Sequence, residues 1–249
     1  MNLSINLNKI SLLRNSRGGD YPSVSEFAEL LLDLGVDGIT LHPRPDLRHA
    51  TPSDCILIRN ICHKRGKEFN MEGNPYCYEN KVYPGFIKLV DSVKPTQTTL
   101  VPDDEYQITS DHGYSVDQLT SSLEEIIHRL KLSTKRISLF IDAGFEEFEL
   151  IKHKSVDCVE IYTGPFANAV ISKNDLSIEN ELFKIKKTYL AAKLYDLRVH
   201  IGHDLNLDNL KIVKQVGDFD EASIGHAFVV DCIRYGIEGA TEKYLKEIK

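Results

Sequence analysis

Apolar residues follow two different spacings along this chain. Short runs of mostly aliphatic residues recur, and each is followed by a stretch in which apolar positions repeat every three or four residues. The short runs predict buried β-strands, and the wider spacing predicts helices with one apolar face. Residues 136–142 form the clearest run, and the clearest helical face is formed by Leu119, Leu123, Ile126, Ile127 and Leu130.

Eight strands are predicted, at residues 3–8, 38–42, 68–72, 98–101, 136–142, 158–162, 198–202 and 222–224. Helices are predicted near residues 27–34, 52–64, 86–93, 119–130, 145–151, 176–195 and 228–247. Strict alternation implies parallel strands with right-handed crossovers, and eight such units fit a chain of 249 residues as a closed (β/α)8 barrel. We therefore predict an α/β protein with a single TIM-barrel domain at residues 1–249. A doubly wound open sheet is the alternative, but no Gly-x-Gly-x-x-Gly motif follows the first strand.

Composition narrows the possible partners. The net charge of −7 does not indicate the general excess of basic residues that is typical of nucleic-acid-binding proteins. No apolar run approaches the roughly 20 residues of a membrane helix. The five cysteines form no Cys-x-x-Cys pair and are expected to be reduced thiols, so we expect a cytoplasmic protein. Two connections, residues 14–22 and 102–115, are long enough to be binding loops.

Polar residues stand at the ends of these otherwise apolar strands. In a (β/α)8 barrel the carboxyl ends of the strands build the reaction site. Histidines and carboxylates transfer protons near neutral pH, and arginine and threonine bind phosphate. The pattern therefore predicts an acid/base site for a phosphorylated small molecule. Its candidate residues are Asn6, Asn8, His42, Arg44, His49, Glu72, Thr109, Asp142, Glu160, His203, Gly225 and His226.

The tripeptide Ile-Gly-His occurs at the ends of the last two strands, as residues 201–203 and 224–226. A glycine between a strand and a helix directs backbone N–H groups toward an anion, and barrels of this kind commonly bind phosphate after strands seven and eight. Arg17 precedes a Gly-Gly pair that allows close backbone approach to a ligand, so it is a further candidate for phosphate binding.

Other interpretations of these residues remain open. Glu72 could be a salt-bridged loop residue, and His200, which lies between two aliphatic residues, is expected to be structural. His42, Glu72 and His203 could form a two-histidine, one-carboxylate metal site. The alternatives to a cofactor-free enzyme are therefore a metal-dependent isomerase or aldolase of sugar phosphates and a non-catalytic phosphate-binding barrel.

Several segments, in order, resemble the pyridoxine 5′-phosphate synthase family of vitamin B6 biosynthesis, and the resemblance covers essentially the whole chain. The segments are Asn6-x-Asn8-Lys9-Ile10, Leu13-Arg14-Asn15-Ser16-Arg17-Gly18, Gly38-Ile39-Thr40-Leu41-His42-Pro43-Arg44, Asp46-x-Arg48-His49, Asn70-Met71-Glu72, Thr99-Leu100-Val101-Pro102, Ser138-Leu139-Phe140-Ile141-Asp142, Glu160-Ile161-Tyr162-Thr163-Gly164, Gly202-His203 and Ile224-Gly225-His226-Ala227.

This resemblance implies a TIM barrel with additional helices that assembles as a homo-octamer. It implies a transferase that condenses 3-amino-2-oxopropyl phosphate with 1-deoxy-D-xylulose 5-phosphate to pyridoxine 5′-phosphate, phosphate and water, with no metal or organic cofactor. Glu72 and His42 would accept protons, His203 would donate one, and Glu160 would stabilise charge in a transition state.

The resemblance also implies two groups of substrate-binding residues. The amino-ketone phosphate would be held by Asn6, Arg17, the backbone of Asp204, Gly225 and His226. The deoxyxylulose phosphate would be held by Arg44, His49 and Thr109, with Asn8 and Lys9 beside it.

The chain departs from the common family pattern at two places. Many members have Asp-His at the positions of Asn8 and Lys9, and one branch of the family has the Asn-x-Asn-Lys form. Lys9 could contact a phosphate in place of the histidine. Asp204 stands where a glycine is common, so its carboxylate must point away from any bound phosphate.

Overall fold

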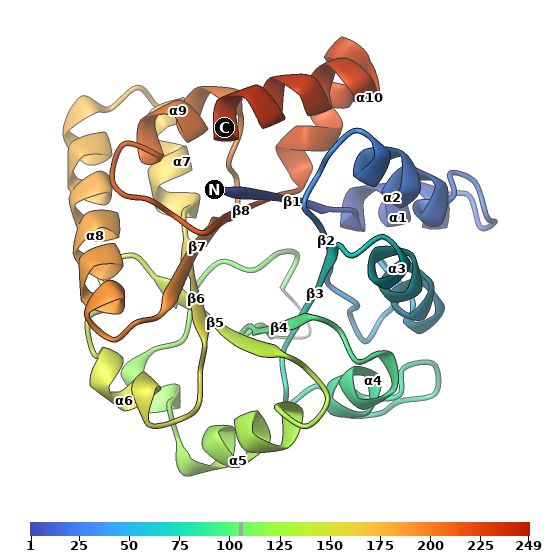
Figure 1. Cartoon of the computed structure of the whole chain (residues 1–249), viewed down its shortest axis with the longest axis horizontal. Coiled ribbons are helices and arrows are strands. Elements are labelled where there is room, and N and C mark those ends of the chain that lie inside the picture. The colour runs from blue at the N-terminus through green and yellow to red at the C-terminus, as the bar shows by residue number, and fades with distance from the viewer. Residues whose placement is uncertain (105–106) are drawn as a thin grey trace.

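Eight parallel strands close into one barrel in the order of the sequence, as Figure 1 shows. The computed structural model describes residues 1–104 and 107–249, so positions 105 and 106 of the predicted loop 102–115 lie outside the described residues. The strands are β1 (Asn2–Asn6), β2 (Gly38–Leu41), β3 (Glu68–Gly73), β4 (Gln97–Leu100), β5 (Arg136–Asp142), β6 (Cys158–Tyr162), β7 (Arg198–Gly202) and β8 (Glu221–Ile224). Pairing of β1 with β8 closes the barrel and confirms the predicted fold class.

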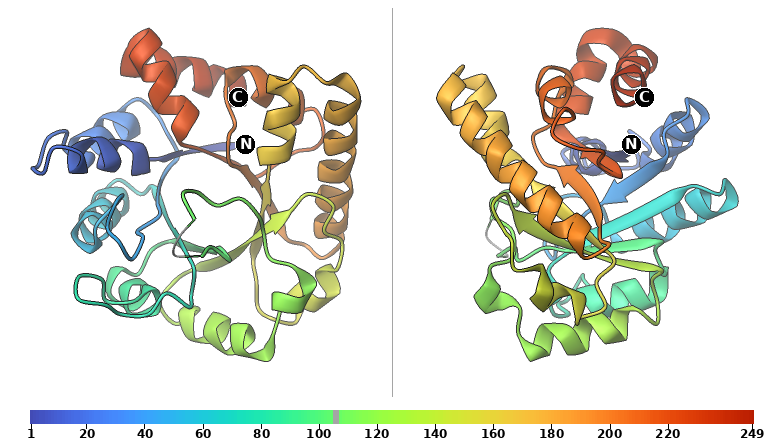
Figure 2. Two further views of the ribbon diagram at one scale, coloured as in Figure 1. Left: turned by 180° about the vertical axis from the view of Figure 1, so that it is seen from behind. Right: turned by 60° about the vertical axis from the view of Figure 1, so that its left-hand side comes forward.

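Helices surround the barrel on the outside (Figure 2). They are α1 (Asn8–Asn15), α2 (Val24–Asp33), α3 (Pro52–Lys64), α4 (Phe86–Val93), α5 (Ser121–Leu130), α6 (Phe148–Lys152), α7 (Gly164–Ile171), α8 (Asp175–Leu194), α9 (Leu207–Val213) and α10 (His226–Ile248), with a 3-10 turn at Val116–Gln118. The long helix α8 packs on β7, and the C-terminal helix α10 packs on β1. Among the described residues, no helix has both the length and the apolarity that crossing a bilayer requires.

The segment after β1 corrects the prediction from the sequence. The pattern predicts Asn8 at the end of the first strand and Arg14 in a loop, whereas both residues lie in α1. The strand ends at Asn6, whose Oδ1 accepts the backbone N–H of Asn8 at 2.9 Å and so satisfies a donor in the first turn of the helix. The sequence pattern also fails to predict α7 and α9, which follow β6 and β7 almost directly.

Local chemistry explains where the predicted elements begin. Helix α3 has a capping box, in which Thr51 Oγ1 accepts the N–H of Asp54 at 3.2 Å and the Asp54 carboxylate accepts the N–H of Thr51 at 2.7 Å. Five consecutive residues of β5, from Ile137 to Ile141, are buried. Burial on both faces is what parallel strands under a helical layer require.

The base of the barrel is closed by polar residues that have partners. Arg136 forms an ion pair with Glu68, and its Nε donates to Gln97 Oε1 at 3.2 Å. His200 is buried beside this group, with its Nδ1 3.4 Å from Gln97 Nε2. Burial, with a smaller effect of Arg198, lowers the pKa of His200 to about 3. A neutral, buried ring agrees with the structural role predicted for His200.

Candidate active site

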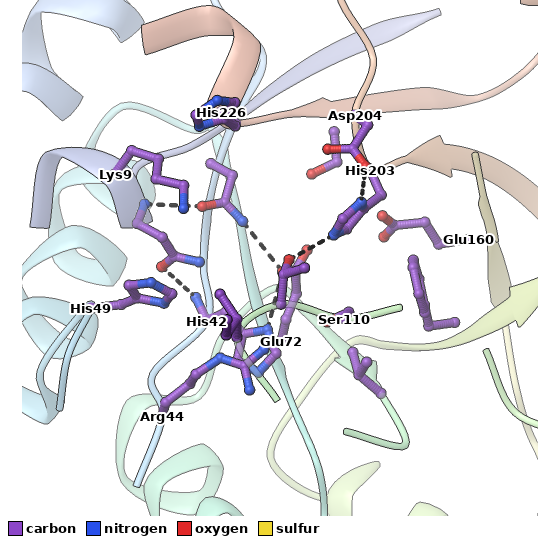
Figure 3. A pocket seen from close by; sticks show the side chains of 18 residues that line it. Lys9, His42, Arg44, His49, Glu72, Ser110, Glu160, His203, Asp204 and His226 are labelled. Carbon is purple, nitrogen blue, oxygen red and sulfur yellow. Dashed lines mark hydrogen bonds and ion pairs between the residues drawn. The ribbon is translucent and has the colours of Figure 1, made fainter. Parts of the chain in front are cut away.

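A cavity of about 290 Å³ opens at the carboxyl ends of the strands (Figure 3). Every substrate-binding or catalytic residue predicted from the sequence lines it, with the exception of Arg17. The lining residues are Asn6, Asn8, Lys9, His42, Arg44, His49, Glu72, Val101, Ile108, Thr109, Ser110, Phe140, Glu160, His203, Asp204, Ser223, Gly225 and His226. The strand ends thus converge on one polar pocket.

Two predicted polar residues lie away from this cavity. Arg17 is exposed on the loop after α1 and does not line the cavity. Asp142 ends β5, and its Oδ1 accepts the backbone N–H of Gly113 at 2.8 Å. Asp142 therefore fastens the returning part of the loop between β4 and α5.

Glu72 lies within β3 rather than in a loop, and its carboxyl group points into the cavity. Its oxygens accept from Asn6 Nδ2 at 3.3 Å and from Asn70 Nδ2 at 3.5 Å. Burial raises the pKa of Glu72 well above its usual value, and the carboxylates of Glu160 and Asp103 raise it further. A raised pKa makes the ionised form of this carboxyl group a stronger base than an exposed carboxylate.

His42 is the neighbour of Glu72, with Nδ1 3.7 Å from Glu72 Oε2. Burial lowers the pKa of His42 well below its usual value, and the positive charge of Arg44 and the adjacent His49 add to this effect. The environment therefore favours the neutral form of both groups. An imidazole that resists protonation stands beside a carboxyl group that binds a proton more readily than an exposed one would.

Glu160, on β6, brings a second buried carboxyl group to the cavity. Burial, with a further effect of Glu221, raises the pKa of Glu160 to about 8. Its side chain lies against the backbone of Gly202, where a Cβ atom would stand only 2.0 Å from Glu160 Oε1. The glycine at the end of β7 therefore makes room for this carboxyl group.

A chain of amide hydrogen bonds ties the ends of β1 and β2 together. Asn6 Oδ1 accepts the N–H of Asn8, and Asn8 Oδ1 accepts the N–H of His42, both at 2.9 Å. An amide oxygen makes the second contact as well as the more common carboxylate would. The departure at Asn8 thus keeps the anchor of His42 and leaves out a negative charge.

Arg44 is buried and meets a carboxylate that the sequence pattern does not single out. Its Nη2 lies 2.6 Å from Asp103 Oδ2, which also accepts from Ser110 Oγ at 2.8 Å. Asp103 and Ser110 both belong to the loop after β4, so this loop is held to β2. The sequence does contain a signal for Asp103, which follows the end of β4 by three residues. The pattern of strand ends nevertheless led only to Thr109 in this loop.

His49 lines the same side of the cavity as Arg44 (Figure 3). Burial, followed by the positive charge of Lys9, lowers the pKa of His49 to about 4. The loop that carries His49 is fixed by Asn15, whose Nδ2 donates to the carbonyl oxygens of His49 at 2.7 Å and Leu47 at 3.0 Å. His49 is therefore a neutral, positioned hydrogen-bonding group.

His203 lies on the opposite wall, between two polar partners (Figure 3). Its Nε2 is 2.9 Å from Thr109 Oγ1, and its Nδ1 is 2.9 Å from Asp204 Oδ2. The hydrogen bond from His203 lowers the pKa of Asp204. The Asp204 carboxylate is turned toward the imidazole of His203. Tyr162 packs edge-on against the imidazole at 5.2 Å between ring centroids.

The backbone at this point is in an uncommon conformation. His203 and Asp204 have φ values of +82° and +58°, a region that side chains other than glycine rarely occupy. Thr163 Oγ1 donates to the carbonyl oxygens of Gly202 at 2.7 Å and His203 at 2.6 Å, and Asn209 Nδ2 donates to that of Asp204 at 3.0 Å. Surrounding hydrogen bonds therefore hold a strained segment at the site.

The N-terminus of α10 points its first residues at the cavity, since Gly225 and His226 both line it. Unpaired N–H groups and the helix dipole at such a terminus favour an anion. The alternative metal site at His42, Glu72 and His203 is not formed. Within residues 1–104 and 107–249, no three histidine, cysteine, aspartate or glutamate side chains are grouped closely enough to hold a metal ion.

The sequence matches known proteins along nearly its full length. Residues 3–249 match the family model described as pyridoxal phosphate biosynthesis protein PdxJ. A pyridoxine 5′-phosphate synthase of Cytophaga hutchinsonii is 40% identical over 248 residues, which cover 99% of this chain and 98% of that protein. A pyridoxine 5′-phosphate synthase of Xanthomonas axonopodis pv. citri is 38% identical over 244 residues, covering 98% and 94% of the two chains.

Solved structures with a similar backbone have little sequence in common with this chain. A thiamine phosphate pyrophosphorylase from Pyrococcus furiosus superposes with a TM-score of 0.60 at 14% identity, covering 99% of this chain and 94% of the other. A tryptophan synthase chain from Mycobacterium tuberculosis superposes with a TM-score of 0.63 at 10% identity, covering 99% and 92%. At such identities the likeness supports the fold alone.

Proposed function

The chain belongs to the family of the pyridoxal phosphate biosynthesis protein PdxJ, and from this premise we infer that it catalyses the pyridoxine 5′-phosphate synthase reaction. It condenses 3-amino-2-oxopropyl phosphate with 1-deoxy-D-xylulose 5-phosphate. Pyridoxine 5′-phosphate, phosphate and water are the products. The observation that carries the assignment of roles is the pair of buried carboxyl groups, Glu72 and Glu160, which line one cavity together with the candidate phosphate-binding residues.

The reaction needs groups that take and return protons. An amine attacks a ketone, water leaves, and C–H protons are removed before the ring becomes aromatic. We assign proton acceptance to Glu72 and His42, because the raised pKa of Glu72 makes its carboxylate a stronger base and the lowered pKa of His42 keeps its imidazole neutral. A substrate cation near Glu72 would favour the loss of its proton and turn it into a base.

Leaving water needs a proton donor, and we assign this role to His203. Thr109 and Asp204 fix both nitrogens of its ring, so the imidazole is held in one orientation. Glu160 would stabilise positive charge that develops during condensation. That charge would favour the loss of the Glu160 proton, and the resulting carboxylate would act in a buried, weakly screening environment.

Two phosphate positions follow from the two sides of the cavity. The N-terminus of α10 at Gly225 and His226, with Asn6 beside it, would hold the amino-ketone phosphate. Arg44, with the set His49, Thr109, Asn8 and Lys9, would hold the deoxyxylulose phosphate. We retain Arg17 as a phosphate contact that would come from the exposed loop after α1.

Incubation of the purified protein with both phosphorylated substrates tests the proposed activity. Formation of pyridoxine 5′-phosphate without an added cofactor is expected, measured by its absorbance after chromatography. A relative of this family serves as the positive control. No product under conditions in which that control works would contradict the assignment.

The role of Glu72 has its own test. Glu72→Gln keeps the size of the side chain and its ability to accept from Asn6, but it cannot take a proton. Turnover is expected to fall by about 10²-fold or more while substrate still binds, because general acid/base catalysis typically contributes that much. A fully active variant would refute the assigned role.

We further propose that the protein assembles as a homo-octamer in the cytoplasm. Large apolar side chains are exposed along α8, among them Leu176, Phe183 and Leu190, and they offer a face for assembly. Buried thiols such as Cys55 and Cys158 suit a reducing compartment. Sedimentation velocity gives the number of copies directly, and a monomeric species at micromolar concentration would exclude the octamer.

A further inference from the structure

A second cavity lies at the opposite end of the barrel from the active site. It measures about 330 Å³, and its lining residues are Arg59, His63, Lys94, Pro95, Thr96, Leu132, Ser133, Thr134 and Lys135. Thr96 and Lys135 directly precede β4 and β5, so the cavity is at the amino ends of these strands. A rise of about 3.3 Å per residue along a strand places it roughly 15–20 Å from the mouth. Its lining comes from α3, from the end of α4 and from the segment after α5, and these three helices are neighbours around the barrel (Figure 1).

This second cavity is lined by basic side chains and by no acidic one. Arg59, Lys94, Lys135 and His63 belong to its lining, in a chain whose net charge is −7. Basic side chains near the cavity but outside its lining have carboxylate partners: Arg129 Nη2 lies 3.0 Å from Asp91 and Lys131 Nζ lies 2.5 Å from Asp157.

The contacts found in the described part of the chain pair none of the cationic side chains that line the cavity with a carboxylate. The uncompensated positive charge is therefore gathered inside the cavity. Ser133 Oγ does donate to Asp91 at 2.9 Å, but this carboxylate is already neutralised by Arg129. An anion in the cavity would meet positive charge on several sides.

Arg59 is held so that part of its guanidinium remains available. Its Nε donates to the carbonyl oxygen of Lys94 at 3.4 Å, and its Nη1 donates to Asn60 Oδ1 at 3.2 Å. These contacts orient the side chain, and within residues 1–104 and 107–249 no hydrogen bond engages Nη2. A guanidinium that is oriented in advance loses little conformational entropy when it binds an oxyanion.

Lys94 occupies a backbone conformation that normally selects glycine. It ends α4 with φ at +52°, whereas α2 and α3 are followed by Gly35 and Gly66 at their positive-φ positions. A side chain in this conformation is energetically unfavourable. At Lys94 that cost is accompanied by an ammonium group in the cavity and a carbonyl oxygen that orients Arg59.

The remaining lining residues indicate the rest of the ligand. Thr96 Oγ1 accepts the backbone N–H of Phe69 at 3.3 Å, which leaves its own proton for donation. Leu132 is 87% exposed and stands beside buried Pro95, and the two form an apolar wall. Cavities of at least about 300 Å³ hold small molecules rather than a lone ion. We propose that this cavity is a second binding site, separate from the active site, for a phosphate ester with a small apolar body.

A tryptophan reporter can test this site without interference from the rest of the protein, because the chain contains no tryptophan. Leu132→Trp places the single fluorophore at the cavity, and the exposure of Leu132 makes the exchange tolerable. Phenyl phosphate is the probe, titrated at constant ionic strength. A saturable change in emission is expected, with tighter binding than inorganic phosphate. No saturable change, equal affinity for both anions, or the same response to sodium chloride would overturn the proposal.

Variants in the second cavity and in the active site show which of the two sites causes the change in emission. In the Leu132→Trp background, Arg59→Gln or Lys135→Gln is expected to weaken phenyl phosphate binding about tenfold, because each removes a charge-assisted contact. Arg44→Gln, in the active site, is expected to leave it unchanged. A loss caused only by Arg44→Gln would overturn the proposal.

A second measurement uses the chain without the reporter. Line broadening of 4-fluorophenyl phosphate in fluorine NMR should be smaller with the Arg59→Gln/Lys135→Gln double variant than with the wild type. Equal broadening would again overturn the proposal. Because neither residue lies near the active site, the double variant is expected to make pyridoxine 5′-phosphate within about twofold of the wild-type rate, so failure here is distinguishable from failure of the proposed function.

Discussion

The two Ile-Gly-His tripeptides end neighbouring strands and yet have different structures. After β7, His203 adopts a positive φ and turns its ring into the cavity between Thr109 and Asp204. After β8, His226 becomes the first residue of α10 and is exposed at the cavity rim. The same three residues therefore supply a fixed side chain in one place and a helix N-terminus in the other.

The neighbours of the two glycines explain this difference. Gly202 faces the carboxyl group of Glu160, and a Cβ atom there would collide with it at 2.0 Å. Gly225 faces the side chain of Asn6, and a Cβ atom on Gly225 would stand 3.2 Å from the Cβ atom of Asn6. Sequence identity over three residues thus determines neither conformation nor role, because tertiary neighbours select both.

Replacement of each histidine by glutamine should produce the largest difference in kinetics between the two strand ends. His203→Gln removes the assigned proton donor and is expected to lower kcat about 10³-fold. His226→Gln leaves the backbone N–H groups of α10 in place and is expected to raise KM for the amino-ketone by less than about tenfold with kcat unchanged. Steady-state kinetics with each substrate varied measures both effects. Equal losses in kcat would remove the distinction between the two strand ends.

Alanine at the two glycines comes next in size. Gly202→Ala is expected to displace Glu160 and lower kcat about 10²-fold, since small misplacements of catalytic groups are costly. Gly225→Ala needs an adjustment of only a few tenths of an ångström and is expected to cost less than tenfold. Thermal unfolding of both variants serves as the control for global damage. If the Gly202→Ala protein were more active than the Gly225→Ala protein, the close contact between residue 202 and Glu160 would be contradicted.

Glu160→Gln sharpens the comparison, because it replaces the carboxyl group that Gly202 accommodates by an amide of the same size that cannot ionise. A raised pKa means that the folded chain keeps a proton that the unfolded chain releases above about pH 4.3. Wild-type stability therefore decreases as the pH rises from about 4.3 to about 8, whereas the amide does not titrate. The variant should be more stable than wild type by roughly 2–4 kcal/mol at pH 8, and by less at pH 5.

Urea unfolding across this pH range measures the difference in stability. Glu149→Gln, at an exposed position of α6, is the matched control and should leave the pH dependence of unfolding as it is in the wild type. A stability difference that does not change with pH would mean that Glu160 is ionised in the folded protein.

Asp204→Gly should have the smallest effect of these substitutions. It is expected to change both the stability of the protein and kcat. Glycine relieves the positive φ of residue 204, which favours folding by up to about 1 kcal/mol. It also removes the partner of His203 Nδ1, so we expect kcat to fall about fivefold. Asp204→Asn keeps an acceptor and should retain most of the activity. Thermal unfolding and kinetics together test this pair, and a fully active glycine variant would show that Asp204 does not position the ring.

The sequence predicts the barrel well, because burial leaves a clear record in the strands. The bounds of β5, β6, β7, α3 and α4 agree with the prediction. Periodicity does not reveal α1, whose first turn is stabilised by the side chain of Asn6, or α9, which has only seven residues and begins with an asparagine capping box. Short helices of this kind depend on single hydrogen bonds rather than on a repeated apolar face.

The candidate site was predictable wherever a candidate residue lies on a strand or directly after it. His42, Glu72 and Glu160 converge as a parallel barrel requires. Asp103 escaped prediction, because its contact with Arg44 depends on how the loop after β4 folds back, and loop conformation has no periodic signal. The position of the Arg17 side chain, which is exposed here, likewise depends on a loop.

The ion pair between Arg44 and Asp103 has a thermodynamic consequence for any anion that arrives there. Asp103 already neutralises the guanidinium through Nη2 at 2.6 Å, so an anion that binds Arg44 must compete with this carboxylate for the positive charge. Its free energy of binding would then include the cost of weakening the existing ion pair. A doubly charged oxyanion would overcome this cost more easily than a singly charged one. The buried carboxylate would therefore act as a built-in competitor that selects for the charge of the ligand.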